Sequence, residues 1–359
     1  MVQMTLGRGD SNVRNLCHVS IEALVRSPAG SPLEMADEAT DKASNGVSTG
    51  TRVQVFLGKG GVGKTTCSAA TALQLADGGQ PSLVISTDPT PSLSHIFEIE
   101  GAHREREVRR GLFLTELGLD DVRNMWNEAF GRDVYAVFSS FVDIDYATFV
   151  QFVTSVLPGL NEEFMVDYIR RLALEARYRH VVWDTAPLGQ TLALLGMPSM
   201  LAEHLRTAPR IYSHLRTSGE RKESVMEILA RWRDLAAECM AFLRRDVRFS
   251  MVTIPEALAV CQLDAVRGEL RRYGLEISRL IVNNVVQVTD SPFLAQKMQH
   301  QQPHLERLRK RHGDVPIVEI PLFPQEIRGL ERLRTVGRFL CLEAAAVPRA
   351  NADTLSPQG

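Results

Sequence analysis

Lysine is almost absent from this 359-residue chain, although positive charge is not. Lysine stands only at positions 42, 59, 64, 222, 297 and 310, so 35 of the 41 basic residues are arginine. Two of the six, Lys59 and Lys64, lie five residues apart within one glycine-rich stretch. Their retention there indicates a role for a compact, flexible ammonium group that a planar guanidinium does not fill.

An excess of either charge is also missing. The 41 basic residues face 43 acidic ones, and the formal net charge is -2. Proteins that bind nucleic acid draw most of their affinity from a basic excess, so this balance argues against such a partner. Hydrophobic residues make up 44% and charged residues 23%, which is an ordinary globular mixture.

Paired cysteines and long apolar runs are absent as well. The five cysteines are odd in number, widely spaced and without a CxxC pair, which argues against a disulfide framework or a structural zinc site. The sequence contains no run of eighteen apolar residues, which is about the length needed to span a bilayer. The first residues lack the apolar segment of a secretory signal. We therefore expect a cytoplasmic protein.

The pattern along the chain predicts an α/β fold. Short apolar runs alternate with helix-period segments from Arg52 onward, which is typical of βαβ units and a mainly parallel sheet covered by helices. We expect a disordered tail at 1–50, one P-loop ATPase domain at 51–345 and a flexible tail at 346–359. An inserted helical subdomain is expected in segments of about 120–175 and 197–245.

Two segments outside the predicted sheet are rich in apolar residues. Residues 126–152 hold eight of the 23 aromatic side chains, and 219–245 forms an amphipathic helix pattern. One interpretation is that both pack into the core of the helical subdomain. The alternative is an apolar groove that binds a partner.

A glycine-rich segment between a predicted strand and a predicted helix matches a phosphate-binding loop. It reads Gly58-Lys59-Gly60-Gly61-Val62-Gly63-Lys64-Thr65 and fits G-x-x-x-x-G-K-[ST] at every fixed position. Glycines let the backbone wrap tightly, so that N–H groups converge on phosphate oxygens at a helix N-terminus. The pattern predicts that Lys64 bridges the β- and γ-phosphates and that the Thr65 hydroxyl binds Mg²⁺.

Two aspartates end predicted buried strands. Asp88 follows the strand 82–86, and Asp184 follows the strand 181–183. Ligands of open α/β sheets bind at the carboxyl ends of the strands, where both aspartates fall. We expect Asp88 to orient the attacking water and Asp184 to lie in the second shell of the Mg²⁺ ion.

The additional lysine identifies a class of P-loop proteins. The segment KGGVGKT resembles the deviant Walker A sequence of the nitrogenase iron protein, of partition and division-site ATPases, and of the arsenite-pump and tail-anchored-protein targeting ATPases. In that class the extra lysine reaches across a dimer to the partner subunit's nucleotide. The resemblance therefore implies a homodimer that is closed by ATP, with Lys59 in a catalytic role.

Four more blocks narrow the resemblance to the last two families. They are STDPTPSLS at 86–94, DTAPLGQTL at 184–192, TIPEAL at 253–258 and PLFPQEIRG at 321–329. The resemblance covers roughly 52–345 and implies ATP and Mg²⁺ as cofactors. It also implies that Thr66 lies in the nucleotide site and that Asn283, Pro321 and Phe323 contact the adenine base.

The chain departs from these families in both switches. It has Pro91 where the first switch carries His, His95 where Asp is usual, and Gln190 for the His of the second. Pro91 fixes φ and removes an N–H donor, so we expect the coupling of this loop to nucleotide to differ from that in the families.

Soft metal ligands are also missing from the expected places. The zinc CxxC pair of many targeting ATPases aligns near 289–292, and a metalloid cysteine of the pump ATPases near 158–163, where this chain has no thiol. We expect Cys239 and Cys261 to be buried in helices and Cys67 to pack behind the phosphate loop.

Two functions fit these observations. The favoured one is an ATP-switched dimer that binds the hydrophobic transmembrane segment of a client and targets it to a membrane receptor. The alternative is the ATPase subunit that energises arsenite or antimonite efflux through a membrane pump.

Overall fold

The structure is a computed structural model that describes residues 50–88, 92–100, 105–139, 145–146, 160–186, 191, 195 and 219–342. The chain divides into residues 1–48 and 49–359, and every described residue belongs to the second unit. Within the described ranges, no helix has the length and apolar character needed to cross a bilayer. The tails predicted at 1–50 and 346–359 lie outside the description except for Gly50, as do Pro91 and Gln190.

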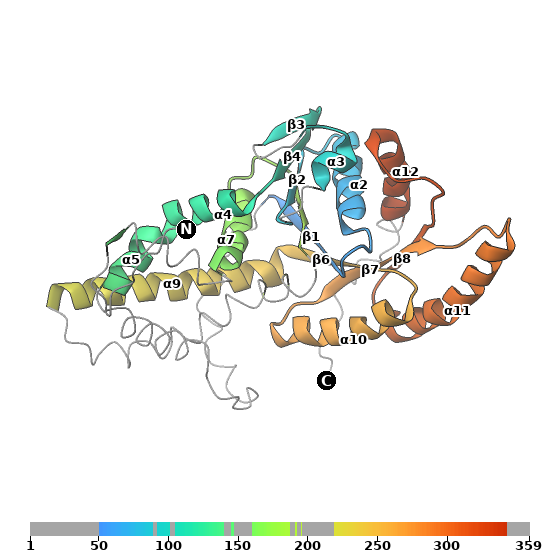
Figure 1. The fold of residues 1–359 in the computed structure, drawn as a ribbon. Coiled ribbons are helices and arrows are strands. Elements are labelled where there is room, and N and C mark those ends of the chain that lie inside the picture. Colours follow the sequence, from blue (N-terminus) through green and yellow to red (C-terminus); the bar gives the residue numbers. More distant parts are fainter. Residues whose placement is uncertain are drawn as a thin grey trace, which may run out of the picture. The chain divides into compact units, whose positions relative to one another are not determined.

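An eight-stranded sheet forms the centre of the described unit (Figure 1). Its strand order is β3-β4-β2-β5-β1-β6-β7-β8, and every pairing is parallel except that of β3 with β4. The strands are β1 (Arg52–Gly58), β2 (Ser82–Ser86), β3 (Arg106–Arg109), β4 (Leu112–Glu116), β5 (His180–Asp184), β6 (Val247–Thr253), β7 (Ile277–Val285) and β8 (Ile317–Pro321). The predicted mainly parallel α/β fold is confirmed.

Helices connect the strands and cover both faces of the sheet. They are α2 (Lys64–Asp77), α3 (Leu93–Phe97), α4 (Leu119–Trp126), the π-helical turn η1 (Asn127–Gly131), α5 (Arg132–Ser139), α7 (Leu160–Leu174), α9 (Gly219–Arg245), α10 (Ala257–Arg272), α11 (Pro292–His312) and α12 (Gly329–Leu342). Helices α2, α3 and α12 share one buried cluster, and α7, α9, α10 and α11 share the other.

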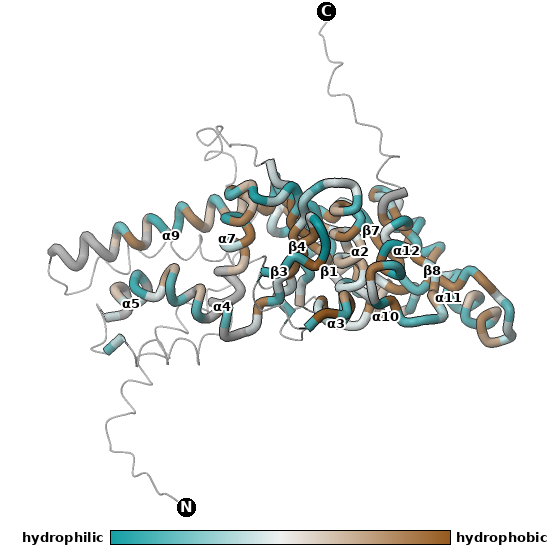
Figure 2. The backbone as a smooth tube through the Cα atoms, turned by 90° about the horizontal axis from the view of Figure 1, so that it is seen from above, coloured by the Kyte–Doolittle hydropathy of each residue, from teal (hydrophilic) through white to brown (hydrophobic). Residues whose placement is uncertain are grey.

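Successive residues of the central strands enter opposite clusters, because side chains alternate along a strand. Val55 and Leu57 of β1 pack against one cluster, whereas Phe56 packs against the other. Covering both faces requires strands that are apolar throughout, which is why these strands read as continuous hydrophobic runs. Figure 2 shows the apolar segments gathered along the central strands and mixed polarity along α9 and α11.

Helices α4, α5, α7 and α9 form the predicted helical part beside the sheet (Figure 1). Helix α7 packs against both α4 and α9, and α9 also contacts α5 and β6. An ion pair between Arg231 of α9 and Asp133 of α5, at 2.8 Å, links two of these helices. The subdomain boundaries at about 120–175 and 197–245 stay predictions, since parts of both segments are not described.

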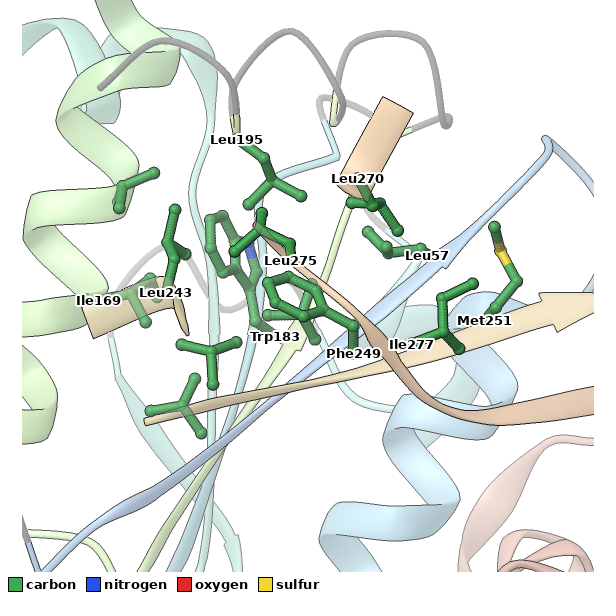
Figure 3. Close-up of a cluster of buried hydrophobic side chains, with 14 of the residues drawn as sticks. Leu57, Ile169, Trp183, Leu195, Leu243, Phe249, Met251, Leu270, Leu275 and Ile277 are labelled. Carbon is green, nitrogen blue, oxygen red and sulfur yellow. The ribbon is translucent and has the colours of Figure 1, made fainter. Parts of the chain in front are cut away.

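The apolar stripe of α9 faces the core. Ile228, Cys239, Phe242 and Leu243 are at most 4% exposed. Figure 3 shows Leu243 beside Trp183 of β5 in the cluster that includes Phe249. These side chains of the predicted amphipathic helix therefore pack into the core, as the first interpretation holds, and do not line an open groove.

Candidate functional site

The phosphate-binding loop joins β1 to α2, as its sequence predicts. Gly63 adopts φ 95°, and a Cβ atom there would come within 2.3 Å of the Asn283 side-chain nitrogen. At Gly58 a Cβ atom would lie 2.4 Å from the Val252 carbonyl oxygen of β6. Only glycine adopts the backbone conformation at 63 without strain, and only glycine fits at 58 without displacing the β6 backbone. The loop is thus tightly seated against the neighbouring strands β6 and β7.

The start of α2 is open to an anion. No side chain caps its first turn, and that turn carries no acidic residue. Backbone N–H groups and the helix dipole at such an end favour negative charge. The loop can therefore receive phosphate oxygens without displacing a protein acceptor.

Lys64, the first residue of α2, is held inside the loop. Its side chain is 7% exposed, and its ammonium group donates to the Lys59 carbonyl at 3.2 Å. Burial lowers the pKa of Lys64, while the nearby charges of Asp184 and Asp88 act in the opposite direction. These two aspartates therefore lie within electrostatic reach of Lys64, and the structure brings the predicted residues together.

Asp184 is fully buried at the end of β5. Burial raises its pKa to about 7, against the lowering effects of the Thr65 hydroxyl, Lys64 and Ser86. Its Oδ2 accepts a hydrogen bond from the Ser86 hydroxyl at 3.3 Å. Its Oδ1 is buried without a hydrogen-bond partner among the described residues. An unpartnered buried carboxylate oxygen next to a hydroxyl ligand suits the hydration shell of Mg²⁺.

These residues therefore fit the magnesium ion that the sequence predicts. Thr65 would supply the hydroxyl ligand and Asp184 would accept hydrogen bonds from its water shell. A bound Mg²⁺ ion would neutralise charge on the β- and γ-phosphates.

Asp88 is tied to the sheet through its neighbours. Its backbone N–H donates to the Ser86 hydroxyl at 3.3 Å. The preceding Thr87 donates its backbone N–H to the Asp184 carbonyl at 3.2 Å and accepts a hydrogen bond from the Trp183 indole at 3.1 Å. The segment that carries Asp88 is thus fastened to the end of β5, beside the phosphate loop.

Residues predicted to contact adenine lie at the ends of β7 and β8. The Asn283 side chain donates to the Val62 carbonyl at 3.0 Å, which anchors β7 to the phosphate loop. Pro321 ends β8, and Phe323 packs edge-on against Phe339 with ring centroids 6.3 Å apart. Their contact with a base stays a prediction.

Lys59, Gly60 and Gly61 form the exposed crest of the loop, whereas Val62 is buried. No described residue forms a hydrogen bond or ion pair with the Lys59 ammonium group, although the Lys59 carbonyl accepts from Lys64. Thr66 is half-buried in the first turn of α2. An exposed Lys59 is compatible with a reach toward another subunit, which stays a prediction.

The described cysteines do not form a metal site. Cys67 lies behind the loop with a pKa raised to about 12 by burial, and Cys239 is buried, as expected. Cys261 is exposed on α10, so the prediction that it is buried is wrong. It falls on the solvent side because α10 buries Val260, Leu263, Val266 and Leu270. Within the described ranges, no three His, Cys, Asp or Glu residues are placed to hold a metal ion.

Sequence reasoning missed three contributors to this site. Ser86, Trp183 and Glu116 link the strand ends to the predicted switch segment. Each stands in the last two positions of a buried strand, which is the signal that could have identified them. The carboxyl edge of the sheet therefore holds more polar groups than the two predicted aspartates.

Comparison with known proteins agrees with this geometry. The family model described as anion-transporting ATPase matches residues 51–342. A putative arsenical pump-driving ATPase 2 of Aquifex aeolicus is 26% identical over 299 residues, covering 81% of this chain and 99% of that protein. The ATPases GET3B and GET3A of Arabidopsis thaliana are 26% and 28% identical, covering 86% and 84% of this chain and 83% and 87% of those proteins. The chain thus belongs to the anion-transporting ATPase family and is an ATPase that uses ATP with Mg²⁺.

Proposed function

We propose that this ATPase is a homodimeric switch that binds a hydrophobic transmembrane segment of a client protein and targets it to a membrane. ATP closes the dimer through Lys59, and hydrolysis directed by Asp88 opens it again. The proposal places the protein in the cytoplasm, where clients emerge from synthesis.

The switch part of the proposal is supported by the contacts around Thr87. Its backbone N–H and its hydroxyl are both bonded to consecutive residues at the end of β5, Asp184 and Trp183. Asp184 in turn shares the electrostatic environment of Lys64. We expect a change at the γ-phosphate to reach the segment that carries Asp88, because Asp184 acts electrostatically on Lys64 and is hydrogen-bonded to Thr87.

The client part is supported by the helices beside the sheet. The aromatic side chains of Phe130, Tyr135 and Tyr146 are half-buried rather than fully covered, and Tyr135 packs edge-on against Tyr146 at 5.1 Å. Trp126 and Phe138 belong to the same predicted aromatic segment, but their side chains lie outside the description. All three rings also pack against the core cluster, so an apolar partner would contact only the part of each ring that this packing leaves uncovered.

The observation that carries the choice between the two candidate functions is the placement of the thiols. Cys67 and Cys239 are buried in separate core clusters, and Cys261 is exposed on α10. Arsenite and antimonite prefer several thiolates converging on one ion, which these three do not provide. This favours an apolar client over a metalloid.

The second candidate is the ATPase subunit of an arsenite or antimonite pump. It is favoured by the name of the Aquifex aeolicus relative, a putative arsenical pump-driving ATPase 2. Cys17 lies outside the description, and so does the side chain of Cys341 in α12, so both thiols stay available to this alternative.

One experiment separates the two candidates. The ATPase rate of the purified full chain is measured with Mg-ATP alone, with an apolar transmembrane peptide, and with millimolar arsenite or antimonite. The proposal predicts that the peptide changes the rate and binds more tightly to one nucleotide state, because coupling between two ligands is reciprocal. A peptide of the same length with charged residues is the control. Stimulation by the metalloid but not by the apolar peptide would establish the pump function instead.

A further inference from the structure

Glu116 is a buried carboxylate at the end of β4, on the same edge of the sheet as the candidate site. Its side chain is 4% exposed. The strand register aligns Glu116 with Ser86 of β2 and Ser86 with Asp184 of β5. Three polar residues thus lie in one row across three adjacent strands. Asp184 lies near Lys64 of the phosphate loop, and Ser86 accepts the Asp88 N–H. The role of Glu116, the third residue of the row, remains to be explained.

The contacts of Glu116 supply that role. Its Oε1 accepts two backbone hydrogen bonds, from Leu93 at 2.8 Å and from Ser94 at 3.2 Å. These are the first two residues of α3, five and six positions after Asp88. The N–H of Asp88 is held by Ser86 at 3.3 Å. The backbone N–H of Asp88 is therefore held by a hydroxyl and that of Leu93 by a carboxylate.

Helix α3 itself is firmly seated. Leu93 is fully buried and Phe97 is 4% exposed, and both belong to the cluster that α2 and α12 share. Arg328, which precedes α12, donates to the His95 carbonyl at 3.4 Å. Glu116 thus joins the end of β4 to the start of a helix that is packed against α2.

Packing alone does not account for a carboxylate here. Burying an ionisable group is costly, and an apolar residue of similar volume often serves stability as well or better. The Oε2 atom of Glu116 is buried without a hydrogen-bond partner among the described residues, which adds to that cost. The use of an acidic side chain is explained if its two charge-assisted bonds to the backbone hold a segment whose position matters.

We infer that Glu116 is a positioning residue for ATP hydrolysis, which fixes the end of the segment that carries the water-orienting Asp88. This inference rests on the proposed role of Asp88. Glu116 touches neither nucleotide nor water in this account. It acts by limiting where the Asp88 carboxylate lies when ATP is bound, so it affects turnover and not nucleotide affinity.

The test compares Glu116→Met, which keeps the volume but has no strong acceptor, with Glu116→Gln, which keeps one acceptor oxygen. We expect kcat to fall about 10-fold or more in Glu116→Met and about 2- to 4-fold in Glu116→Gln, because a residue that acts on the transition state changes kcat and spares ground-state binding. KM and the affinity for a fluorescent ATP analogue stay within about 2-fold of wild type for both. Partial rescue by the amide is the readout that a volume or packing effect would not give.

Glu107 is the matched control. This exposed glutamate also accepts a backbone hydrogen bond, from Gly111 at 2.9 Å, but it stands in β3 opposite Phe113, near the start of β4 and away from the carboxyl edge of the sheet. Glu107→Met is expected to keep wild-type kcat. Thermal unfolding of each variant reports the folded fraction, and if Glu116→Met does not fold, the kcat of Glu116→Gln decides.

The outcomes distinguish this inference from the proposed function. If Asp88→Asn is inactive while both Glu116 variants turn over at the wild-type rate, the positioning role of Glu116 is wrong and the role of Asp88 stands. If Asp88→Asn hydrolyses ATP normally, the proposed role of Asp88 fails, and the inference fails with it. A Glu116 variant that weakens ATP binding in proportion to its loss of kcat would also overturn the inference.

Discussion

The indole nitrogen of Trp183 donates a hydrogen bond of 3.1 Å to the hydroxyl of Thr87. Trp183 is fully buried beneath the helices α7 and α9, whereas Thr87 immediately precedes Asp88. A ring that lies in the core (Figure 3) is therefore hydrogen-bonded to the residue before Asp88. A movement of the segment that carries Asp88 should therefore change the environment of the Trp183 indole, which fluorescence can measure.

The first prediction uses this ring as a reporter. A variant with Trp126→Phe and Trp232→Phe leaves Trp183 as the sole tryptophan of the chain. Its fluorescence should differ between the Mg-ADP and Mg-ATP states, because a shift of the Asp88 segment lengthens or realigns the indole hydrogen bond. Replacing Thr87 by Val should abolish the difference while nucleotide still binds. An emission spectrum that is identical in both nucleotide states would argue that this segment does not move.

The second prediction concerns Asp184 and pH. Burial raises its pKa to about 7, from 3.8 for an exposed group, so the folded state holds this proton more tightly than the unfolded state. The protonated Asp184 therefore contributes its full stabilisation of the fold below about pH 4, and this contribution is lost as the pH rises through 7. In the absence of nucleotide, the free energy of unfolding should fall by an extra ~2 kcal/mol between pH 5 and 8 in wild type relative to Asp184→Asn.

Urea unfolding at several pH values measures this difference. The comparison with Asp184→Asn removes the contributions of other titrating groups. A wild-type curve that runs parallel to that of the variant would show that Asp184 titrates in the ordinary carboxylate range.

The third prediction concerns Gly63. Alanine there must adopt φ 95°, and its Cβ atom would meet the Asn283 nitrogen at 2.3 Å. Because the loop must deform, Gly63→Ala should weaken Mg-ATP binding by about 100-fold and destabilise the fold by roughly 1–3 kcal/mol. Gly268→Ala is the control: it lies in α10 with open space around its Cβ position, and it should leave ATP binding intact and stabilise the fold by about 0.5–1 kcal/mol. Unchanged ATP affinity in Gly63→Ala by calorimetry would be incompatible with the loop geometry.

The fourth prediction concerns the scarcity of lysine. Lys64 is 7% exposed within a backbone cradle, and the larger planar guanidinium of arginine does not fit there. Lys64→Arg should therefore lose measurable ATP binding, whereas Lys310→Arg, at an exposed position of α11, should behave as wild type. Equilibrium binding of a fluorescent nucleotide checks both. Retained affinity in Lys64→Arg would mean that charge, and not shape, is what the site requires.

The sequence predicts most of this architecture because two strong signals coincide. Apolar runs such as 82–86 mark the buried strands, and the glycine pattern fixes where the phosphate loop lies. Edge strand β3 escaped prediction because Arg106–Arg109 has no apolar alternation and gains its structure from pairing with β4. A tertiary contact of this kind leaves no local pattern.

Individual contacts of the site were less predictable. Asp184 is the last residue of β5 and Asp88 follows the end of β2 by two residues, and this position alone signals a ligand-binding edge of the sheet. The bonds from Glu116 to Leu93 and Ser94 join residues 22 or 23 positions apart, so they depend on the register between β2 and β4. The sequence pattern does not specify that register. It also did not reveal which face of α10 is buried, and Cys261 lies on the exposed face.

The central claim is that ATP closes a homodimer through Lys59. Sedimentation velocity of the hydrolysis-deficient Asp88→Asn variant tests it most directly, with Mg-ATP and with Mg-ADP, alone and combined with Lys59→Arg. The account predicts a dimer with Mg-ATP that loosens with Mg-ADP and weakens when Lys59→Arg is added, while ATP affinity persists. A chain that stays monomeric with bound Mg-ATP, or a dimer indifferent to both nucleotide and Lys59, would contradict it.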